Sequence, residues 1–323
     1  MAMETAASLS TTVAQTQQKY YDKLFLKVAE AKLVHKQLGQ RDDSVPQGAG
    51  GFGSGLVQWT RMLNLTLVSA GQGEGKATTA ISLSAVAVTA TPAQYDGAVS
   101  ISDILAYTSF GDIMQKAVQR LAYNAGVSID TIIRNVVATG GTLQSATGVA
   151  GAAWTSIPAT GTLTLSEIKK AVRTLRRNDT PELSDGYYVS VIHPDALYDL
   201  MVDTSTGGWI DVNKYTESNV KSLLKGEVGK VAGVRFLESS NGYVRGAGIT
   251  ASASIYVTSI FGQEAFGVTE LQKLKTYIKG FGSAGAADPT DKIATAGWKT
   301  TFAVAPLNTS FFVNLHHTVS STA

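Results

Sequence analysis

Residues 110–137 carry the strongest periodic signal of the chain. At a rise of 1.5 Å per residue they would form a helix of about 42 Å, well beyond the three or four turns of an average helix. Gly126 is expected to bend this helix, and Ser109 with Asp112 resembles a capping arrangement at its start. The pattern predicts a helix that crosses a flat domain as a spine. Its apolar face consists of Phe110, Ile113, Met114, Ala117, Val118, Leu121, Ala122, Ala125, Ile129, Ile132, Ile133, Val136 and Val137.

The composition argues against several classes of protein. Lys+Arg 27 against Asp+Glu 25 gives a net charge of +2, whereas a dedicated nucleic-acid binder shows a dense basic field. There is no cysteine, so disulfides and thiolate metal sites are excluded. The N-terminal residues show no signal-peptide or transit pattern, and no apolar run reaches the roughly 20 residues of a membrane span. Only 16% of the residues are charged, which is typical of surfaces covered by copies of the same chain.

The part of the chain before the long helix predicts an arm and a hairpin. Residues 13–38 have apolar side chains at helical spacing, and the glycine-rich residues 39–55 are expected to form a flexible joint. Apolar and polar residues alternate in 56–68 and 81–88, which predicts two paired strands. Because a two-stranded ribbon alone is marginal in water, we expect this hairpin to rest on another subunit.

The part after the long helix predicts an α+β unit and a β-rich tail. After a loop over 139–162, Thr164 and Glu167 form a candidate capping box for a helix over 165–177. A buried strand is predicted at 187–193, followed by a helix that Pro194 is well placed to open. Residues 241–252 are expected to form a long turn. Further strands are predicted at 234–237, 253–261, 271–279, 298–305 and 311–316.

Two glycine motifs resemble nucleotide-binding loops, but neither has the required context. In "SAGQGEGKATTA", residues 69–80, Gly75-Lys76 is followed by Ala77, and Ala70 stands where a phosphate loop has its first glycine. A strand pattern follows where that motif needs a helix. Residues 48–53 match a dinucleotide-binding pattern by spacing but lack a preceding strand and a following helix.

The residue pattern gives no convincing catalytic set, cofactor site or metal site. The four histidines, His35, His193, His316 and His317, lack metal-binding spacing, and His193 is expected at a strand end or helix cap. No nucleophile elbow is present. Helix 165–177 carries a basic face that could contact nucleic acid or an acidic neighbour, although a solvated face is the commoner meaning of such a cluster. That face consists of Lys169, Lys170, Arg173, Arg176 and Arg177.

The order of parts, arm, joint, long hairpin, very long helix, α+β unit and closing strands, resembles phage major capsid proteins of the Hong Kong 97 type. The blocks "KAVRTLRRNDTPELSDGYYVSVIHPDALYDLMVD", "GEVGKVAGVRFLES", "GSAGAADP" and "GWKTTFAVAPLN" resemble the family named after coliphage N-four. The resemblance implies an α+β capsid fold with a peripheral and an axial domain. It divides the chain into an N-terminal arm (1–55), an extended E-loop with its flanking strands (56–103), a peripheral domain with the spine helix (104–159), an axial domain (160–285) and return strands (286–323).

The resemblance also implies a non-enzymatic shell protein of the virion. Pentamers and hexamers would form an icosahedral head around double-stranded DNA, contacted non-specifically. The chain would be synthesised in the host cytoplasm, with separate scaffold and portal proteins and decoration proteins as a further possibility. A nanocompartment shell, a secreted surface-layer protein and a phosphate-loop enzyme remain alternatives. The resemblance also makes Lys76 a candidate for a covalent link to an asparagine of a neighbouring subunit. Expected E-loop contacts are Trp59, Arg61, Leu63, Leu65, Leu67, Glu74, Lys76, Ile81 and Leu83, and expected arm contacts are Tyr21, Leu24, Phe25 and Val28.

Overall fold

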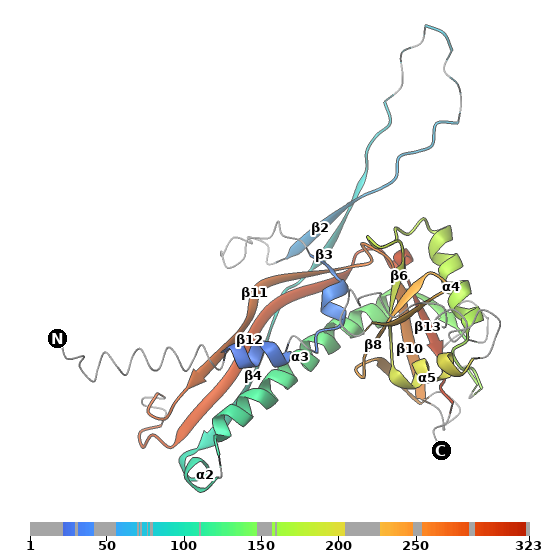
Figure 1. The fold of residues 1–323 in the computed structure, drawn as a ribbon. Helices are drawn as coiled ribbons and strands as arrows, with labels where there is room; N and C mark the ends of the chain where they lie inside the picture. The colour runs from blue at the N-terminus through green and yellow to red at the C-terminus, as the bar shows by residue number, and fades with distance from the viewer. Residues whose placement is uncertain are drawn as a thin grey trace, which may run out of the picture.

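The computed structural model shows two β-sheets joined by one long helix, with a hairpin that projects away from both (Figure 1). It describes residues 22–29, 32–41, 56–69, 71, 73–75, 77, 80–109, 111–146, 157–158, 160–203, 227–247, 254–283 and 288–320. The predicted joint over 39–55 and the glycine motif at 48–53 fall largely or wholly outside these residues.

Helix α3 (Ile113–Gly140) confirms the predicted long helix, displaced by three residues at each end. Asp112, rather than Ser109, caps it by accepting a hydrogen bond from the Gln115 amide at 3.1 Å. The helix runs without interruption through Gly126. A Cβ at Gly126 would lie 2.7 Å from the Ala29 carbonyl oxygen, so this glycine allows the helical segment 22–29 to approach closely.

The predicted helix over 13–38 is not continuous. Residues 22–29 are helical, residues 32–34 are not, and a separate 3-10 helix η1 (His35–Leu38) follows. Phe25 and Ala29 are buried against α3. The segment therefore follows the surface of α3 and then turns to join the first sheet through β1 (Gln40–Arg41).

The first sheet has four strands in the order β1-β11-β12-β4. Strands β11 (Phe266–Lys279) and β12 (Ile293–Pro306) contain the predicted strands but are longer, and β4 (Ala93–Ser102) was not predicted. The N-terminal half of α3 packs on one face of this sheet. The core between them contains Phe25, Val118, Leu121, Ala122, Ala125, Ala296 and Trp298.

The second sheet has seven strands in the order β5-β13-β10-β6-β8-β7, and β9 also pairs with β10. Helices α4 (Leu165–Arg177) and α5 (Pro194–Val202) cover one face, and the C-terminal half of α3 covers the other. Strands β6, β8, β10 and β13 confirm predicted strands. The bounds are β5 (Thr142–Ser145), β6 (Tyr188–Ile192), β7 (Glu227–Val231), β8 (Val234–Glu238), β9 (Tyr243–Ala247), β10 (Ser254–Phe261) and β13 (Phe312–His317).

Two local predictions for this second region are wrong. Strand β9 lies inside the predicted turn over 241–252. The Thr164 side chain makes no capping bond; the Leu165 amide donates to Asp203 instead, while Glu167 accepts from Gln144 and Lys170. The predicted helix opening at Pro194 is confirmed, and His193 caps α5 by accepting from the Asp195 amide at 3.3 Å.

Candidate assembly interface

The base of the projecting hairpin is anchored in the chain's own core. Strands β2 (Val57–Met62) and β3 (Ala85–Ala90) pair with each other. Trp59 is only 6% exposed and packs with Val57 against Ala303 and Ala305 of β12. A Cβ at Gly267 would lie 2.9 Å from the Trp59 ring, so this glycine makes room for it. The sequence placed Trp59 at a subunit interface; in the structure its ring packs within its own chain and fastens the hairpin to its own sheet.

Beyond the hairpin, the described residues between 63 and 84 extend outward as an irregular loop. The predicted strands do not reach 68 or begin at 81; the ladder ends at Met62 and Ala85, with one further bond from the Leu63 amide to the Ser84 carbonyl at 2.9 Å. The described residues supply no third strand for this ribbon, and an isolated two-stranded ribbon is marginal in water. Among the described residues after Gly75, the next element is strand β3 and not the helix that a phosphate loop requires, so the structure gives a phosphate loop no support.

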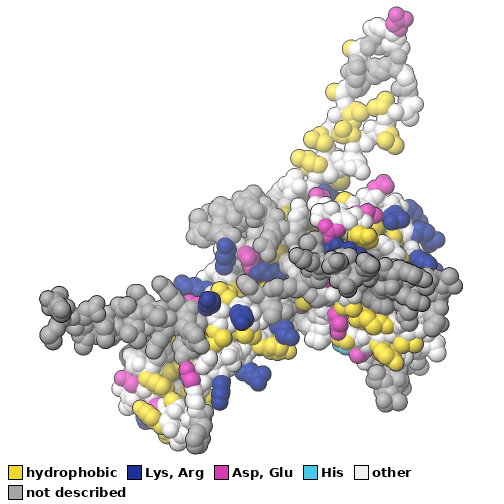
Figure 2. All heavy atoms as spheres, viewed as in Figure 1, with side chains coloured by type: hydrophobic (Ala, Val, Ile, Leu, Met, Phe, Trp, Pro, Cys, Tyr) yellow, Lys and Arg dark blue, Asp and Glu magenta, His cyan; other side chains and the backbone are white. Residues whose placement is uncertain are grey.

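The loop exposes most of the apolar residues that the sequence placed at an interface (Figure 2). Leu67 is 90% exposed and Leu83 is 64% exposed. Arg61 is half-buried, Glu74 is exposed, and Lys76 lies outside the described residues, so the covalent link stays a prediction. Exposed apolar surface in a row of this size marks a binding surface. Its large members are Met62, Leu63, Leu65, Leu67, Val68, Ile81 and Leu83.

The expected contact residues of the arm, like those of the hairpin, include some that are buried in their own chain and some that are not. Phe25 is 1% exposed and belongs to the core formed with α3, so it anchors the arm within its own chain. Leu24 and Val28 are half-buried, Leu26 is exposed, and Tyr21 lies outside the described residues. Thr276 of β11 also donates a hydrogen bond to Asp22, whose pKa is raised by burial.

A second exposed apolar cluster was missed by sequence reasoning. Helix α2 (Asp103–Thr108) has no buried residue, and Ile104 and Tyr107 are 70% and 86% exposed. The Asp103 amide donates to the Lys292 carbonyl at 2.9 Å, which places α2 at the end of the four-stranded sheet. The available signal was the short apolar run "DILAYT", which is too brief for a periodicity argument.

A buried polar junction was also missed. Asp130 of α3 is fully buried and accepts from the His35 amide at 2.8 Å and from Asn241 Nδ2 at 3.2 Å, while His35 Nδ1 lies 2.9 Å from its second oxygen. One turn later, Arg134 donates to Asn241 Oδ1 at 2.9 Å and stacks over Tyr243, and burial lowers the pKa of Arg134. The junction fixes the N-terminal segment and the β8–β9 turn to α3. Its sequence signal is a charged residue inside an apolar helical stripe.

The remaining histidines occupy the second sheet. His316 and His317 are buried, and desolvation lowers the pKa of each to about 4. His317 Nε2 lies 2.9 Å from Thr258 Oγ1. Within the described ranges, no group of three or more His, Cys, Asp or Glu side chains is placed to hold a metal ion. No helix in the described part of the chain is both long and apolar enough to span a membrane.

Comparison with known proteins identifies the class. A sequence profile of the phage capsid protein family matches residues 85–310, more than two thirds of the chain. The capsid of Ralstonia phage GP4 superposes with a TM-score of 0.70 at 13% identity, covering 88% of each chain. The Cyanophage Pam1 capsid gives a TM-score of 0.65 at 16% identity, covering 88% of this chain and 89% of that one.

A virus-like particle from Pyrococcus furiosus has the same fold, with a TM-score of 0.51 at 10% identity, covering 93% of this chain and 99% of that one. No curated protein sequence matches this chain significantly. The α+β fold is therefore the Hong Kong 97-type capsid fold. The chain belongs to the phage capsid protein family: it is a structural, non-enzymatic protein of the phage virion that forms a shell from copies of itself.

Proposed function

We propose that this chain is a major capsid protein whose pentamers and hexamers form an icosahedral head around packaged double-stranded DNA. Family membership supports the proposal, and one observation carries the mechanism. The loop over 63–84 exposes a row of large apolar side chains that no described part of the chain covers. Such a surface is completed when a neighbouring copy covers it.

The hairpin and its loop act as the E-loop, held at one end and free at the other. Trp59 anchors the base in its own subunit, while Leu67 and Leu83 are available for a neighbour. Burying one leucine contributes roughly 1.5–3 kcal/mol. Because each subunit both gives and receives one loop, this modest contact repeats around every ring and favours cooperative closure of the shell.

The same proposal assigns the other parts of the chain to the parts of a capsid subunit. Residues 1–55 serve as the arm, α3 as the spine helix of a peripheral domain (104–159), residues 160–285 as the axial domain, and 286–323 as returning strands. The family named after coliphage N-four is the proposed subgroup. Separate scaffold and portal proteins, with optional decoration proteins, complete the head.

Deletion of residues 69–80 tests the role of the loop. The shortened chain retains Trp59 and both sheets, so we expect the helical and strand content of the parent and a cooperative unfolding transition. We expect no closed shells by negative-stain microscopy. Native-like particles formed by the deletion variant would rule out the proposed role.

A protein nanocompartment is the second candidate, because the Pyrococcus furiosus particle shares the fold. The two functions differ in cargo. Double-stranded DNA extracted from nuclease-treated particles supports the phage head, and particles that contain only protein support the nanocompartment.

A further inference from the structure

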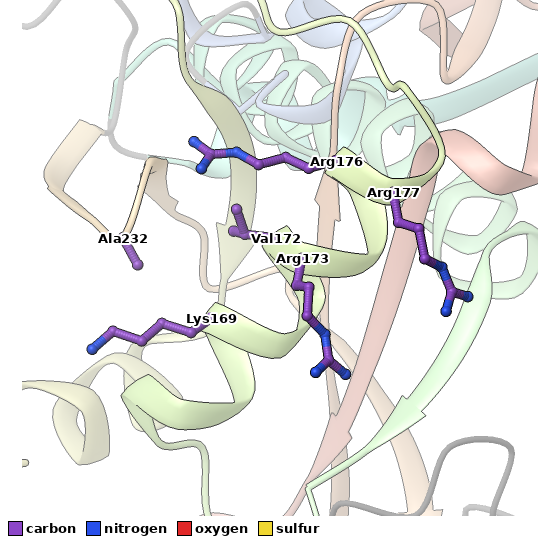
Figure 3. A pocket seen from close by; sticks show the side chains of 6 residues that line it. All are labelled: Lys169, Val172, Arg173, Arg176, Arg177 and Ala232. Atoms are coloured by element: carbon purple, nitrogen blue, oxygen red, sulfur yellow. The ribbon is translucent and has the colours of Figure 1, made fainter.

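The exposed side of α4 carries four cations around a shallow depression (Figure 3). Lys169 and Arg176 extend on the side of Ala232, in the turn between β7 and β8, whereas Arg173 and Arg177 extend on the other side. The depression has a volume of ≈ 630 Å³. An apolar stripe that includes Ile168, Ala171 and Leu175, each fully buried, holds α4 on the second sheet. The cations therefore stand on a rigid element.

Few acids among the described residues balance these charges. Among the described residues, Arg176 has one acidic partner, Glu182 at 3.6 Å, and both side chains are partly exposed. No ion pair within the described ranges involves Lys169, Arg173 or Arg177. Cations in the last turn of a helix favourably oppose its dipole. Lys169 and Arg173 lie in earlier turns, where that explanation does not apply.

The shape of the depression favours an acidic peptide over nucleic acid. Residues four apart on a helix are separated by about 6 Å along its axis, which matches the roughly 6.8 Å between alternate side chains of an extended strand. The floor consists of Val172 and Ala232, so an apolar side chain fits between the two groups of cations. A DNA-binding surface instead needs a broad basic field, and this chain has a net charge of only +2.

We propose that this depression binds an acidic segment of a partner protein other than this chain. The segment is extended, its alternate carboxylates bind Arg173 and Arg177, and an apolar side chain between them covers Val172 and Ala232. Arginine suits this role because its guanidinium pairs with a carboxylate through two parallel hydrogen bonds. The site is separate from the loop over 63–84, so it serves attachment of another protein to the shell rather than shell closure.

The test uses the full chain and a fluorescein-labelled dodecapeptide of alternating Glu and Leu, with fluorescence anisotropy as the readout. We expect binding that weakens at high salt, and at least tenfold weaker binding in Arg173→Glu/Arg177→Glu. Lys273→Glu/Lys279→Glu, a matched double charge reversal on exposed positions of β11, should bind like the parent. A peptide with Lys in place of Glu should not bind. Thermal unfolding verifies that both variants fold.

Three results would overturn the proposal. The first is that Arg173→Glu/Arg177→Glu binds the peptide as well as the parent does, or that both double variants lose binding to the same extent. The second is a short DNA duplex that binds more tightly than the peptide and depends on Arg173 and Arg177, which would make this a nucleic-acid site. The third is failure of shell assembly in Arg173→Glu/Arg177→Glu but not in the β11 control. That result would show that a neighbouring copy of this chain, rather than another protein, occupies the depression. This last result would leave the proposed capsid function intact.

Discussion

The seven-stranded sheet and the projecting hairpin both contain strands rich in apolar residues, but these strands differ in burial. Strands β6 and β13 are buried at every position, because helices from the same chain cover both faces of the sheet. Strand β3 is exposed or half-buried throughout, although its alanine- and valine-rich sequence is at least as apolar as the sequences of β6 and β13. Strand-forming residues therefore do not decide burial by themselves. The first region is completed by its own chain, and we propose that the loop over 63–84, beyond the anchored base of the hairpin, is completed by another copy.

The largest loss of subunit stability is expected in the core of the seven-stranded sheet. Phe236 of β8 is fully buried beneath α4 and α5, so Phe236→Ala leaves a cavity that the rigid sheet fills poorly. We expect a loss of about 3–5 kcal/mol in the free energy of unfolding, measured by urea denaturation of the unassembled subunit. A loss below about 1 kcal/mol would show that this sheet is not the main stabilising core.

Acid should weaken the same region and spare the hairpin, which carries no histidine. Burial lowers the pKa of His316 and His317 to about 4, with Arg245 also acting on His316 and His193 on His317. The unfolded chain takes up protons near pH 6.5, whereas the folded chain resists them until about pH 4. Stability is therefore fully present above pH 6.5 and is lost as the pH falls toward 4, by on the order of 3 kcal/mol for each ring.

Urea denaturation at pH 7.0 and pH 4.5 measures this loss. His316→Gln/His317→Gln serves as the comparison, because glutamine does not titrate. The loss between the two pH values should be several kcal/mol smaller in the variant. Equal losses in the variant and the parent would exclude these histidines as its source.

A smaller effect is expected where the N-terminal segment meets α3. In Gly126→Ala, the new Cβ would clash with the Ala29 carbonyl, so the segment 22–29 must shift at a cost of about 1–3 kcal/mol. Gly246→Ala is the matched control, since nothing lies within 4 Å of its added Cβ. Thermal unfolding of both variants measures the difference. Equal stabilities would mean that the arm contributes little to the fold of the subunit.

The smallest effect on the subunit is expected in the projecting loop. Leu67→Ser and Leu83→Ser alter side chains that touch little of their own chain, so the free energy of unfolding should change by less than about 0.5 kcal/mol. The same variants should assemble poorly, as measured by sedimentation of shells. A large loss of subunit stability would contradict the division between the two regions.

The sequence predicted the elements whose signal is local. The apolar stripe of α3 and the buried runs of β6, β10 and β13 were identified because each pattern is complete within its own segment. Strands β4, β5, β7 and β9 were missed because they are short, polar or interrupted by glycine, and their stability comes from partners distant in the chain. For the same reason, the sequence placed Trp59 at a subunit interface, whereas the structure buries its side chain within its own chain. A large apolar side chain does not indicate whether its own chain or another copy covers it.

Amide hydrogen exchange in the free subunit and in assembled shells tests the central claim most directly. Within the described residues of 63–84, the only backbone hydrogen bond joins the Leu63 amide to the Ser84 carbonyl, so we expect fast exchange of the loop in the free subunit. Their exchange should slow at least tenfold in the shell, while α3 and β6 should be equally protected in both states. Equal exchange of the loop in free and assembled protein would contradict the claim that a neighbouring copy completes it.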